Sequence, residues 1–196
     1  MRLYSQTDFK GASATLQRGG ILGVPTETVY GLAVRMDSEK GIKKLLELKD
    51  RPIDGEKALT MMLADVDQIK DYAAVERRHM NFARHYFPGE LTIILPKREG
   101  FENYYFDRRD TIGIRIPAHE YMLQLIRENG PLLVTSANPR GETPCYSAQE
   151  LRQRMPKIDG IVRGTCGGSL PSTVVDLCSN EPKSLRQGGL LIVRYA

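Results

Sequence analysis

Apolar positions repeat with helical spacing in several stretches of the chain. Phe9, Ala12 and Leu16 share one face of an expected helix that Thr7 or Asp8 can cap and that Gly19-Gly20 ends. The same spacing predicts helices from Asp37 or Ser38 to about residue 48, at 65–86 with interruptions, and at 119–129. A further short helix is expected to begin at the capping box of Ser147-Ala148-Gln149-Glu150.

Short apolar runs between these helices predict buried strands. The runs lie at 21–24, 58–63, 91–95, 111–116, 132–135, 158–163 and 172–177, and two more short stretches, 184–186 and 190–195, end the chain. Helices that alternate with strands, with a strand-rich last third, predict an α/β fold. We expect a single domain over 1–196, built on a twisted, mixed, open sheet that helices flank.

Composition narrows the class of protein without naming one. The chain has 196 residues, of which 41% are hydrophobic and 27% charged, as in ordinary soluble domains. No apolar run is long enough to span a membrane, the N-terminus does not resemble a signal peptide, and the three cysteines are widely spaced. These features predict a cytoplasmic protein without a metal site of its own, and the net charge of +4 suits an anionic ligand.

Polar residues gather where the expected strands end. Pro25-Thr26-Glu27-Thr28 follows the first buried run, and Thr135-Ser136-Ala137-Asn138 follows a later one. Strand ends are the usual place for ligands in α/β sheets, so these stretches should converge on one cleft. Each stretch taken alone also fits a polar turn, with Thr26 or Thr28 acting as a cap.

Basic residues add to this picture. Lys49-x-Arg51 lies at a helix end, where it can either offset the helix dipole or clamp a phosphate. Period two places Thr111, Gly113 and Arg115 on one face of a strand. The charge of Arg115 inside an apolar strand needs a carboxylate, supplied by a ligand or by an internal Asp or Glu.

The last third carries two more polar stretches. Ser172-Thr173-Val174-Val175-Asp176 begins a strand after Gly167-Gly168, and glycines there allow close approach to a ligand. Arg186-Gln187-Gly188-Gly189 is either a ligand contact or a solvated turn. Neither the P-loop nor the dinucleotide fingerprint is present.

Together these motifs resemble those of the YrdC family, the threonylcarbamoyl-AMP synthases of tRNA modification. The resemblance covers about residues 10 to 194. In chain order its motifs are Pro25-Thr26-Glu27-Thr28-Val29-Tyr30-Gly31-Leu32, Lys49-x-Arg51-Pro52, Pro88-Gly89-x-Leu91-Thr92, Ile114-Arg115-x-Pro117, Thr135-Ser136-Ala137-Asn138 with Gly141, Ser172-Thr173-Val174-Val175-Asp176 and Arg186-x-Gly188.

The resemblance implies a reaction and its participants. Threonine and bicarbonate would form N-carboxy-threonine, which attacks the α-phosphate of ATP and releases pyrophosphate and threonylcarbamoyl-AMP. Magnesium would accompany the triphosphate, and a tRNA-modification complex would receive the adenylate. The family's sheet has a cationic concave face, so weak RNA binding is also expected.

The resemblance also assigns residues. Lys49 and Arg51 would stabilise charge during catalysis. The ATP-binding positions correspond to Lys49, Arg51, Thr111, Asn138, Tyr146 and Arg186. The threonine-binding positions correspond to Thr28, Arg115, Ser136 and Ser172, with Arg115 on the substrate carboxylate.

Further expectations concern the segment after Lys49 and the C-terminal end of the resemblance. Lys49 and Arg51 should lie at the surface of the site, and the charged segment 49–57 should form a mobile lid. Its loop Asp54-Gly55-Glu56-Lys57 is about two residues longer than is usual in the family, and Met62 stands where some members carry a histidine. The C-terminal domain of the longer synthases is expected to be absent.

Two alternatives remain open. A related protein of the same fold could use another substrate, which a threonine-dependent release of pyrophosphate would distinguish. A non-catalytic RNA-binding module could use the basic concave face, aided by Tyr104-Tyr105-Phe106 near Arg108-Arg109. Such a module would bind RNA with a steep salt dependence and would not turn over nucleotide.

Overall fold

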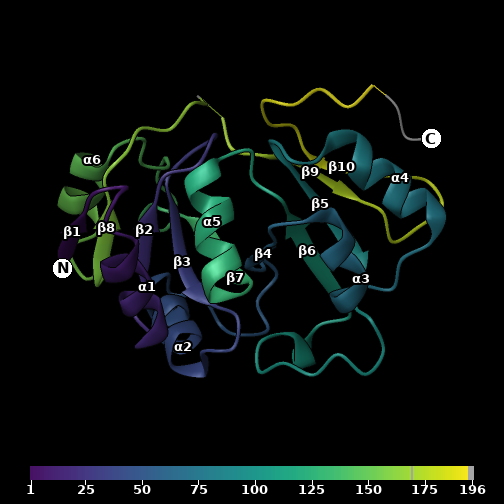
Figure 1. The fold of residues 1–196 in the computed structure, drawn as a ribbon. Coiled ribbons are helices and arrows are strands. Elements are labelled where there is room, and N and C mark those ends of the chain that lie inside the picture. Colours follow the sequence, from purple (N-terminus) through teal and green to yellow (C-terminus); the bar gives the residue numbers. More distant parts are fainter. Residues whose placement is uncertain (169, 194–196) are drawn as a thin grey trace.

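A computed structural model describes residues 1–168 and 170–193 of the chain. Its centre is a mixed sheet in the order β1-β8-β2-β3-β7-β4-β6-β5-β9-β10 (Figure 1). The strands are β1 (Arg2–Tyr4), β2 (Leu22–Val24), β3 (Gly31–Arg35), β4 (Thr60–Met62), β5 (Leu91–Pro96), β6 (Thr111–Arg115), β7 (Leu132–Ser136), β8 (Gly160–Val162), β9 (Thr173–Asp176) and β10 (Lys183–Arg186).

Helices cover both faces of the sheet. They are α1 (Phe9–Gln17), α2 (Glu39–Leu48), α3 (Ile69–Tyr72), α4 (Arg77–Tyr86), α5 (Glu120–Asn129) and α6 (Ala148–Arg154), with short 3-10 helices η1 (Val66–Gln68) and η2 (Phe106–Arg108). The two faces carry separate apolar clusters, because neighbours such as Leu132 and Leu133 point to opposite sides of a strand. Buried residues of α1 and α5 join the cluster of Leu132, which we call the α5 face, and those of α2, α3, α4 and α6 join the other.

The expected α/β fold with a mixed open sheet is confirmed, and the helices begin where the capping residues predict. The side chains of Asp8, Ser38 and Ser147 accept backbone N–H bonds at the starts of α1, α2 and α6. Two strands, β1 and β3, were not predicted. Residues 190–193 of the expected last apolar stretch form neither helix nor strand, and 194 and 195 lie outside the described residues.

The segment 101–110, expected to be a loop, differs in one respect. It contains η2, and the rings of Tyr105 and Phe106 are fully buried in the core. The Tyr105 hydroxyl accepts a hydrogen bond from the backbone N–H of Leu59 at 2.7 Å. These aromatic residues are therefore core residues, and they are not available for stacking on RNA.

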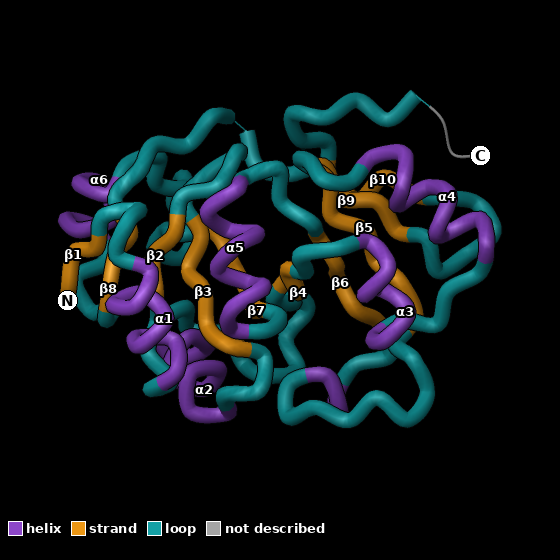
Figure 2. The backbone as a smooth tube through the Cα atoms, in the orientation of Figure 1, coloured by secondary structure: helices purple, strands orange, loops and turns teal. Residues whose placement is uncertain are grey.

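Strand register and one long crossing place the polar motifs together. Gly31 pairs with Ser136, which brings the end of the first motif beside the end of β7. The connection from β8 to β9 crosses six intervening strands, as the order of the sheet requires and as Figure 2 shows. Gly168 in this connection lies so close to Thr28 that an added Cβ would be 3.1 Å from its Cα. No helix in the described ranges is long and apolar enough to cross a membrane.

Candidate functional site

The Thr26–Tyr30 loop between β2 and β3 is held by its own hydroxyl groups. Thr26 Oγ1 accepts the backbone N–H of Thr28 at 3.1 Å and donates to the carbonyl oxygen of Val29 at 2.7 Å. Tyr30 donates its hydroxyl to the carbonyl oxygens of Val162 and Gly164, both at 2.9 Å. Thr26 therefore stabilises a turn before a strand, with no helix to cap, and Tyr30 fixes the start of the glycine-rich crossing.

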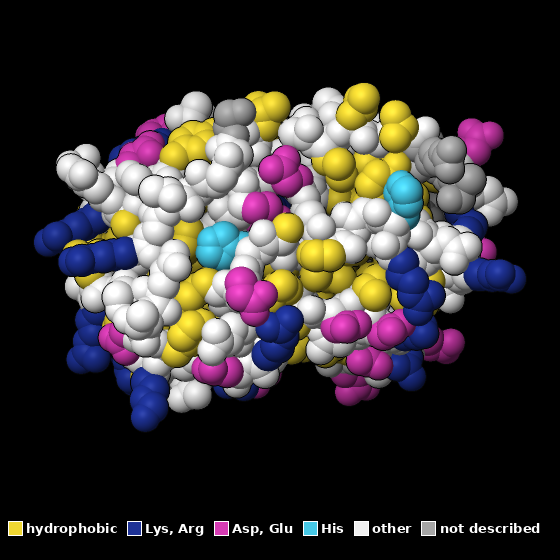
Figure 3. Space-filling view, turned by 45° about the horizontal axis from the view of Figure 1, so that its top comes forward, with side chains coloured by type: hydrophobic (Ala, Val, Ile, Leu, Met, Phe, Trp, Pro, Cys, Tyr) yellow, Lys and Arg dark blue, Asp and Glu magenta, His cyan; other side chains and the backbone are white. Residues whose placement is uncertain are grey.

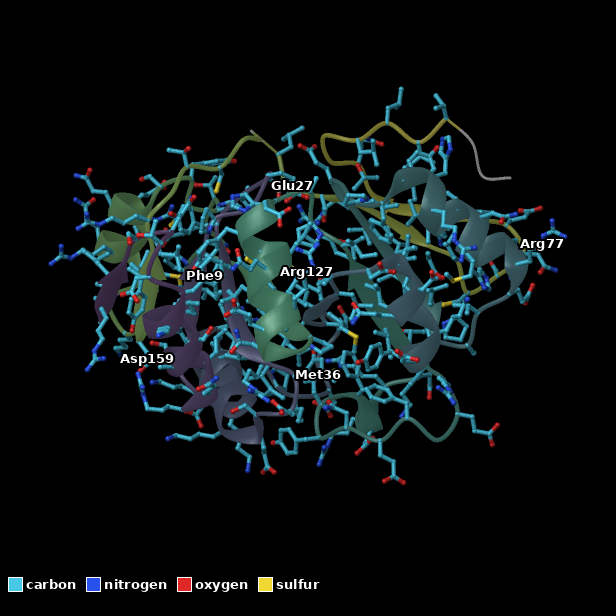
Figure 4. All side chains as sticks on the ribbon, in the orientation of Figure 1. Phe9, Glu27, Met36, Arg77, Arg127 and Asp159 are labelled. Carbon is cyan, nitrogen blue, oxygen red and sulfur yellow. The ribbon has the colours of Figure 1, made fainter. Side chains whose placement is uncertain are left out.

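Arg115 has an internal carboxylate partner. Its Nη2 lies 2.8 Å from Glu27 Oε1 and also donates to Thr28 Oγ1 at 2.9 Å. The same Glu27 oxygen accepts the backbone N–H of Ala118 at 3.0 Å, at the start of α5, where Figure 4 shows Glu27. Arg115 pairs in register with Met62, so its side chain lies on the α5 face. Of the two partners that the sequence left open, the structure therefore shows the internal one.

Ser172 and Arg186 contact each other near Arg115. Thr92 and Ser172 share a hydrogen bond between their hydroxyls at 2.9 Å. Arg186 donates to the carbonyl oxygen of Ser172 at 2.8 Å and to its hydroxyl at 3.2 Å. The pKa of Arg186 is lowered, first by burial and then by the charge of Arg115. The structure thus places Arg186, assigned to ATP, in direct contact with Ser172, assigned to threonine.

Lys49 is buried, which corrects the expectation that it lies at the surface of the site. Only 1% of the residue is exposed. Its Nζ donates to the carbonyl oxygen of Ser136 at 3.0 Å, to that of Asn138, and to Asn138 Oδ1 at 3.1 Å. Burial, with Arg51 as the next cause, lowers the pKa of Lys49 to about 8. Lys49 therefore holds the end of β7 and the turn that follows it through these three hydrogen bonds.

Arg51 lies closer to the surface than Lys49. Its Nη1 donates to Thr135 Oγ1 at 3.1 Å, and the residue is partly exposed. Burial is the main cause that lowers the pKa of Arg51, and the nearby charge of Arg140 adds to it. The neighbouring turn is closed by Ser136, whose hydroxyl donates to Asn138 Oδ1 at 2.7 Å.

Two candidates, Thr111 and Tyr146, remain to be placed. Thr111 is exposed at the start of β6, at the opposite end of the strand from Arg115. The backbone N–H of Tyr146 donates to Glu150 Oε2 at 2.9 Å, just before α6. Cys145, next to Tyr146, accepts the backbone N–H of Tyr30, so this segment adjoins the first motif.

Some site residues were not identified from the sequence. Glu27 stood in the first motif without a role, Thr92 was not linked to Ser172, and Thr135 was not linked to Arg51. The need of Arg115 for a carboxylate predicted the class of its partner. It could not select Glu27, which is 88 positions away by residue number.

Charge on the visible surface is mixed. On the face shown in Figure 3, Lys and Arg side chains lie mainly along the margins and alternate with acidic ones. This face therefore offers no continuous basic surface for RNA. Within residues 1–168 and 170–193, no group of three His, Cys, Asp or Glu side chains is arranged to hold a metal ion.

The structure therefore shows an α/β fold in which polar side chains gather where strands end, with the buried cations Lys49 and Arg115 among them. The family model Sua5_yciO_yrdC, with the description "Telomere recombination", matches residues 14–188. The chain belongs to this family.

Similar proteins agree with this assignment. A threonylcarbamoyl-AMP synthase of Idiomarina loihiensis is 37% identical over 169 residues, which are 83% of this chain and 89% of that protein. The crystal structure of P. abyssi Sua5 complexed with L-threonine matches with a TM-score of 0.88 and 31% identity over 97% of this chain, which spans 58% of that chain. The crystal structure of E. coli YciO shares the fold, with a TM-score of 0.85 and 24% identity, and the match covers 96% of this chain and 97% of that one.

Proposed function

We propose that this protein is an L-threonylcarbamoyladenylate synthase, which joins L-threonine, bicarbonate and ATP and releases pyrophosphate. The observation that carries the proposal is the meeting of distant motifs in two groups. One contains Arg115 with Glu27 and Thr28, and the charge of Arg115 also acts on Arg186, which contacts Ser172. Ser172 in turn shares a hydrogen bond with Thr92. Lys49, Arg51, Ser136 and Asn138 belong to the other.

The first group suits threonine. Arginine binds a carboxylate through strong, charge-assisted hydrogen bonds. The hydroxyls of Thr28 and Ser172 are short polar groups beside it, both on buried residues. The related P. abyssi protein was solved in complex with L-threonine.

The second group suits the triphosphate. Arg51 and Lys49 bring two positive charges to the turn at 135–138, where their contacts among the described residues are neutral oxygens. In the proposed step, a carbamate oxygen of N-carboxy-threonine attacks the α-phosphorus, and the bond to the β-phosphate oxygen breaks. Positioning and charge neutralisation supply most of the catalysis in such transfers, with no need for a protein nucleophile.

Magnesium, bicarbonate and partners complete the proposal. Since the described residues form no acidic cluster, magnesium would arrive with ATP, bound by its phosphate oxygens. A tRNA-modification complex would receive the adenylate in the cytoplasm. Weak RNA contact at the concave face stays a prediction.

The decisive experiment is a reconstitution with labelled threonine. Purified protein, ATP, magnesium and bicarbonate should yield labelled threonylcarbamoyl-AMP and an equal amount of pyrophosphate. Omission of bicarbonate or of threonine should abolish both products. Pyrophosphate release that depends on another amino acid would instead indicate a related enzyme with a different substrate, and the absence of any turnover would contradict the proposal.

A further inference from the structure

Glu27 has a second carboxylate oxygen that the mechanism has not used. Oε1 is occupied by Arg115 Nη2 at 2.8 Å and by the backbone N–H of Ala118 at 3.0 Å. Oε2 is buried and has no hydrogen-bond partner among the described residues. The Glu27 side chain is 14% exposed, so bulk water is a poor substitute for a partner. A buried acceptor without a partner is unfavourable, and a donor on a ligand would satisfy it.

Arg115 carries a buried hydrogen-bond donor without a partner among the described residues. Its Nη2 donates to Thr28 Oγ1 at 2.9 Å and lies 2.8 Å from Glu27 Oε1 in the ion pair. Its Nε is buried without a partner among residues that the structure describes. The Arg115–Glu27 pair therefore leaves a buried donor on Arg115 and a buried acceptor on Glu27 without partners among the described residues, on the α5 face of the sheet.

We propose that Glu27 is a substrate-binding residue, which holds the α-ammonium group of threonine while Arg115 holds the carboxylate. An α-amino acid at neutral pH carries a negative and a positive group on either side of one carbon atom. A neighbouring arginine and glutamate are complementary to it, because the arginine binds the carboxylate and the glutamate binds the ammonium group. The inference rests on the proposed function and adds to it a residue to which neither the sequence nor the family resemblance gave a role.

The surroundings hold Glu27 in place for this task. The backbone of Glu27 and Thr28 lies against the glycine-rich crossing, where a Cβ at Gly168 would be 3.1 Å from the carbonyl oxygen of Glu27. His119, the residue before α5, has a pKa lowered mainly by burial, so its imidazole is neutral at pH 7. It therefore does not compete as a charged partner of the carboxylate, which stays available to a cationic ligand.

The reaction can use the same contact. Once threonine is carboxylated, its nitrogen still carries one hydrogen, which Glu27 Oε2 can accept. The contact to the amine thus fixes the nitrogen, and with it the new carbamate, relative to the carboxylate held by Arg115. Such positioning raises the rate of attack on ATP without any further chemistry from Glu27.

The test compares two ligands that differ at one group. L-Threonine and (2S,3R)-2,3-dihydroxybutanoate, in which a hydroxyl replaces the ammonium, are titrated calorimetrically into wild-type and Glu27→Gln protein. Loss of a hydrogen bond to a charged group should weaken threonine binding roughly ten- to a hundredfold. Binding of the dihydroxy acid should weaken by less than about threefold, because its hydroxyl carries no charge to lose.

Controls separate this role from simple support of Arg115. Glu120→Gln removes the same charge from an exposed glutamate at the start of α5 and should leave both affinities unchanged. Arg115→Lys should weaken both ligands, since both have the carboxylate. Thermal melts confirm that each variant is folded.

The outcomes are distinct. Equal weakening of both ligands by Glu27→Gln, or no weakening of either, would overturn the inference and leave the proposed function standing. Failure of the wild-type protein to bind threonine would overturn the proposed function and the inference with it.

Discussion

Two polar regions of the sheet differ in how their positive charges are balanced. Arg115 is paired with Glu27 at 2.8 Å, and both side chains are largely buried. Lys49 and Arg51 instead contact neutral oxygens of Ser136, Asn138 and Thr135. The Arg115–Glu27 pair is almost neutral by itself, with Arg186 nearby as a further positive charge, whereas Lys49 and Arg51 form an excess of positive charge.

The difference indicates which ligand each region suits. A zwitterion has no net charge, so it is best met by a pair of opposite charges that lie close together. A triphosphate is strongly anionic and favours cations that have no internal carboxylate to displace. The pKa of Lys49 and that of Arg51 are lowered mainly by burial and secondarily by neighbouring positive charge, so a bound anion would offset the cost of burying these cations.

The largest effect is expected from Arg51→Ala. Removal of the partly exposed Arg51 guanidinium beside Lys49 should lower kcat/KM for ATP by roughly 10²–10³, the range seen when a preorganised charge-stabilising donor is lost. Threonine affinity measured without ATP should change little. Lys43→Met, on the exposed side of α2, is the matched control and should have near-normal kinetics. A normal rate in Arg51→Ala would remove this residue from the site.

The next effect concerns pH and Lys49. Its pKa is lowered to about 8 from 10.5, so the charged form that donates to three oxygens is lost as pH rises through 8. If turnover needs that form, kcat/KM for ATP should fall about tenfold per unit above this pH, because kcat/KM reports the free enzyme. Lys49→Arg keeps the charge and should remove the decline, even if its rate is lower. A wild-type rate that stays flat to pH 9.5 would contradict the assignment.

The same shift has a consequence for stability with the opposite sign. The unfolded chain binds more protons at this lysine between pH 8 and 10.5, so the free energy of unfolding gains a contribution that rises with pH across that window. Chemical denaturation of wild-type and Lys49→Met protein at pH 7.5 and 9.5 would isolate this contribution.

A smaller effect tests whether Arg186 and Ser172, which contact each other, serve different substrates. If Arg186 serves ATP and Ser172 serves threonine, Ser172→Ala should weaken threonine binding by about three- to tenfold and spare ATP. Arg186→Ala should do the reverse. The contact of Arg186 with the Ser172 hydroxyl at 3.2 Å predicts some coupling between them. If Ser172→Ala weakens ATP binding as much as threonine binding, Ser172 and Arg186 do not serve separate ligands.

The smallest effect concerns the segment 49–57. Arg109 Nη2 donates to the carbonyl oxygens of Ile53 at 2.8 Å and Gly55 at 2.9 Å, which hold this segment near Tyr105. If it is a lid, ATP with threonine should slow hydrogen exchange at residues 51–57. Arg109→Gln should raise exchange in the free protein and raise KM for ATP a few-fold. Equal exchange with and without both substrates would contradict a lid.

The sequence by itself determined the local elements and the class of the fold. Helical spacing and capping residues placed α1, α2, α5 and α6, because these depend on contacts a few positions apart. Period two placed Gly113 and Arg115 on one face of β6. The strand β3 was not predicted from Gly31–Arg35, although its first four residues are buried, because Gly31 and the polar motif just before it are also typical of a turn.

Only the tertiary structure decided which groups meet. Glu27 reaches Arg115, and Lys49 reaches Asn138, through the register of the mixed sheet and the helices packed on it. The need of a buried charge for a partner can be inferred from one residue, but the choice of partner depends on strand order, which local patterns do not encode. For the same reason Lys49, expected at the surface of the site, is buried. Its side chain reaches the carbonyl oxygen of Ser136 at the end of β7, 87 positions away, and this contact depends on the tertiary fold.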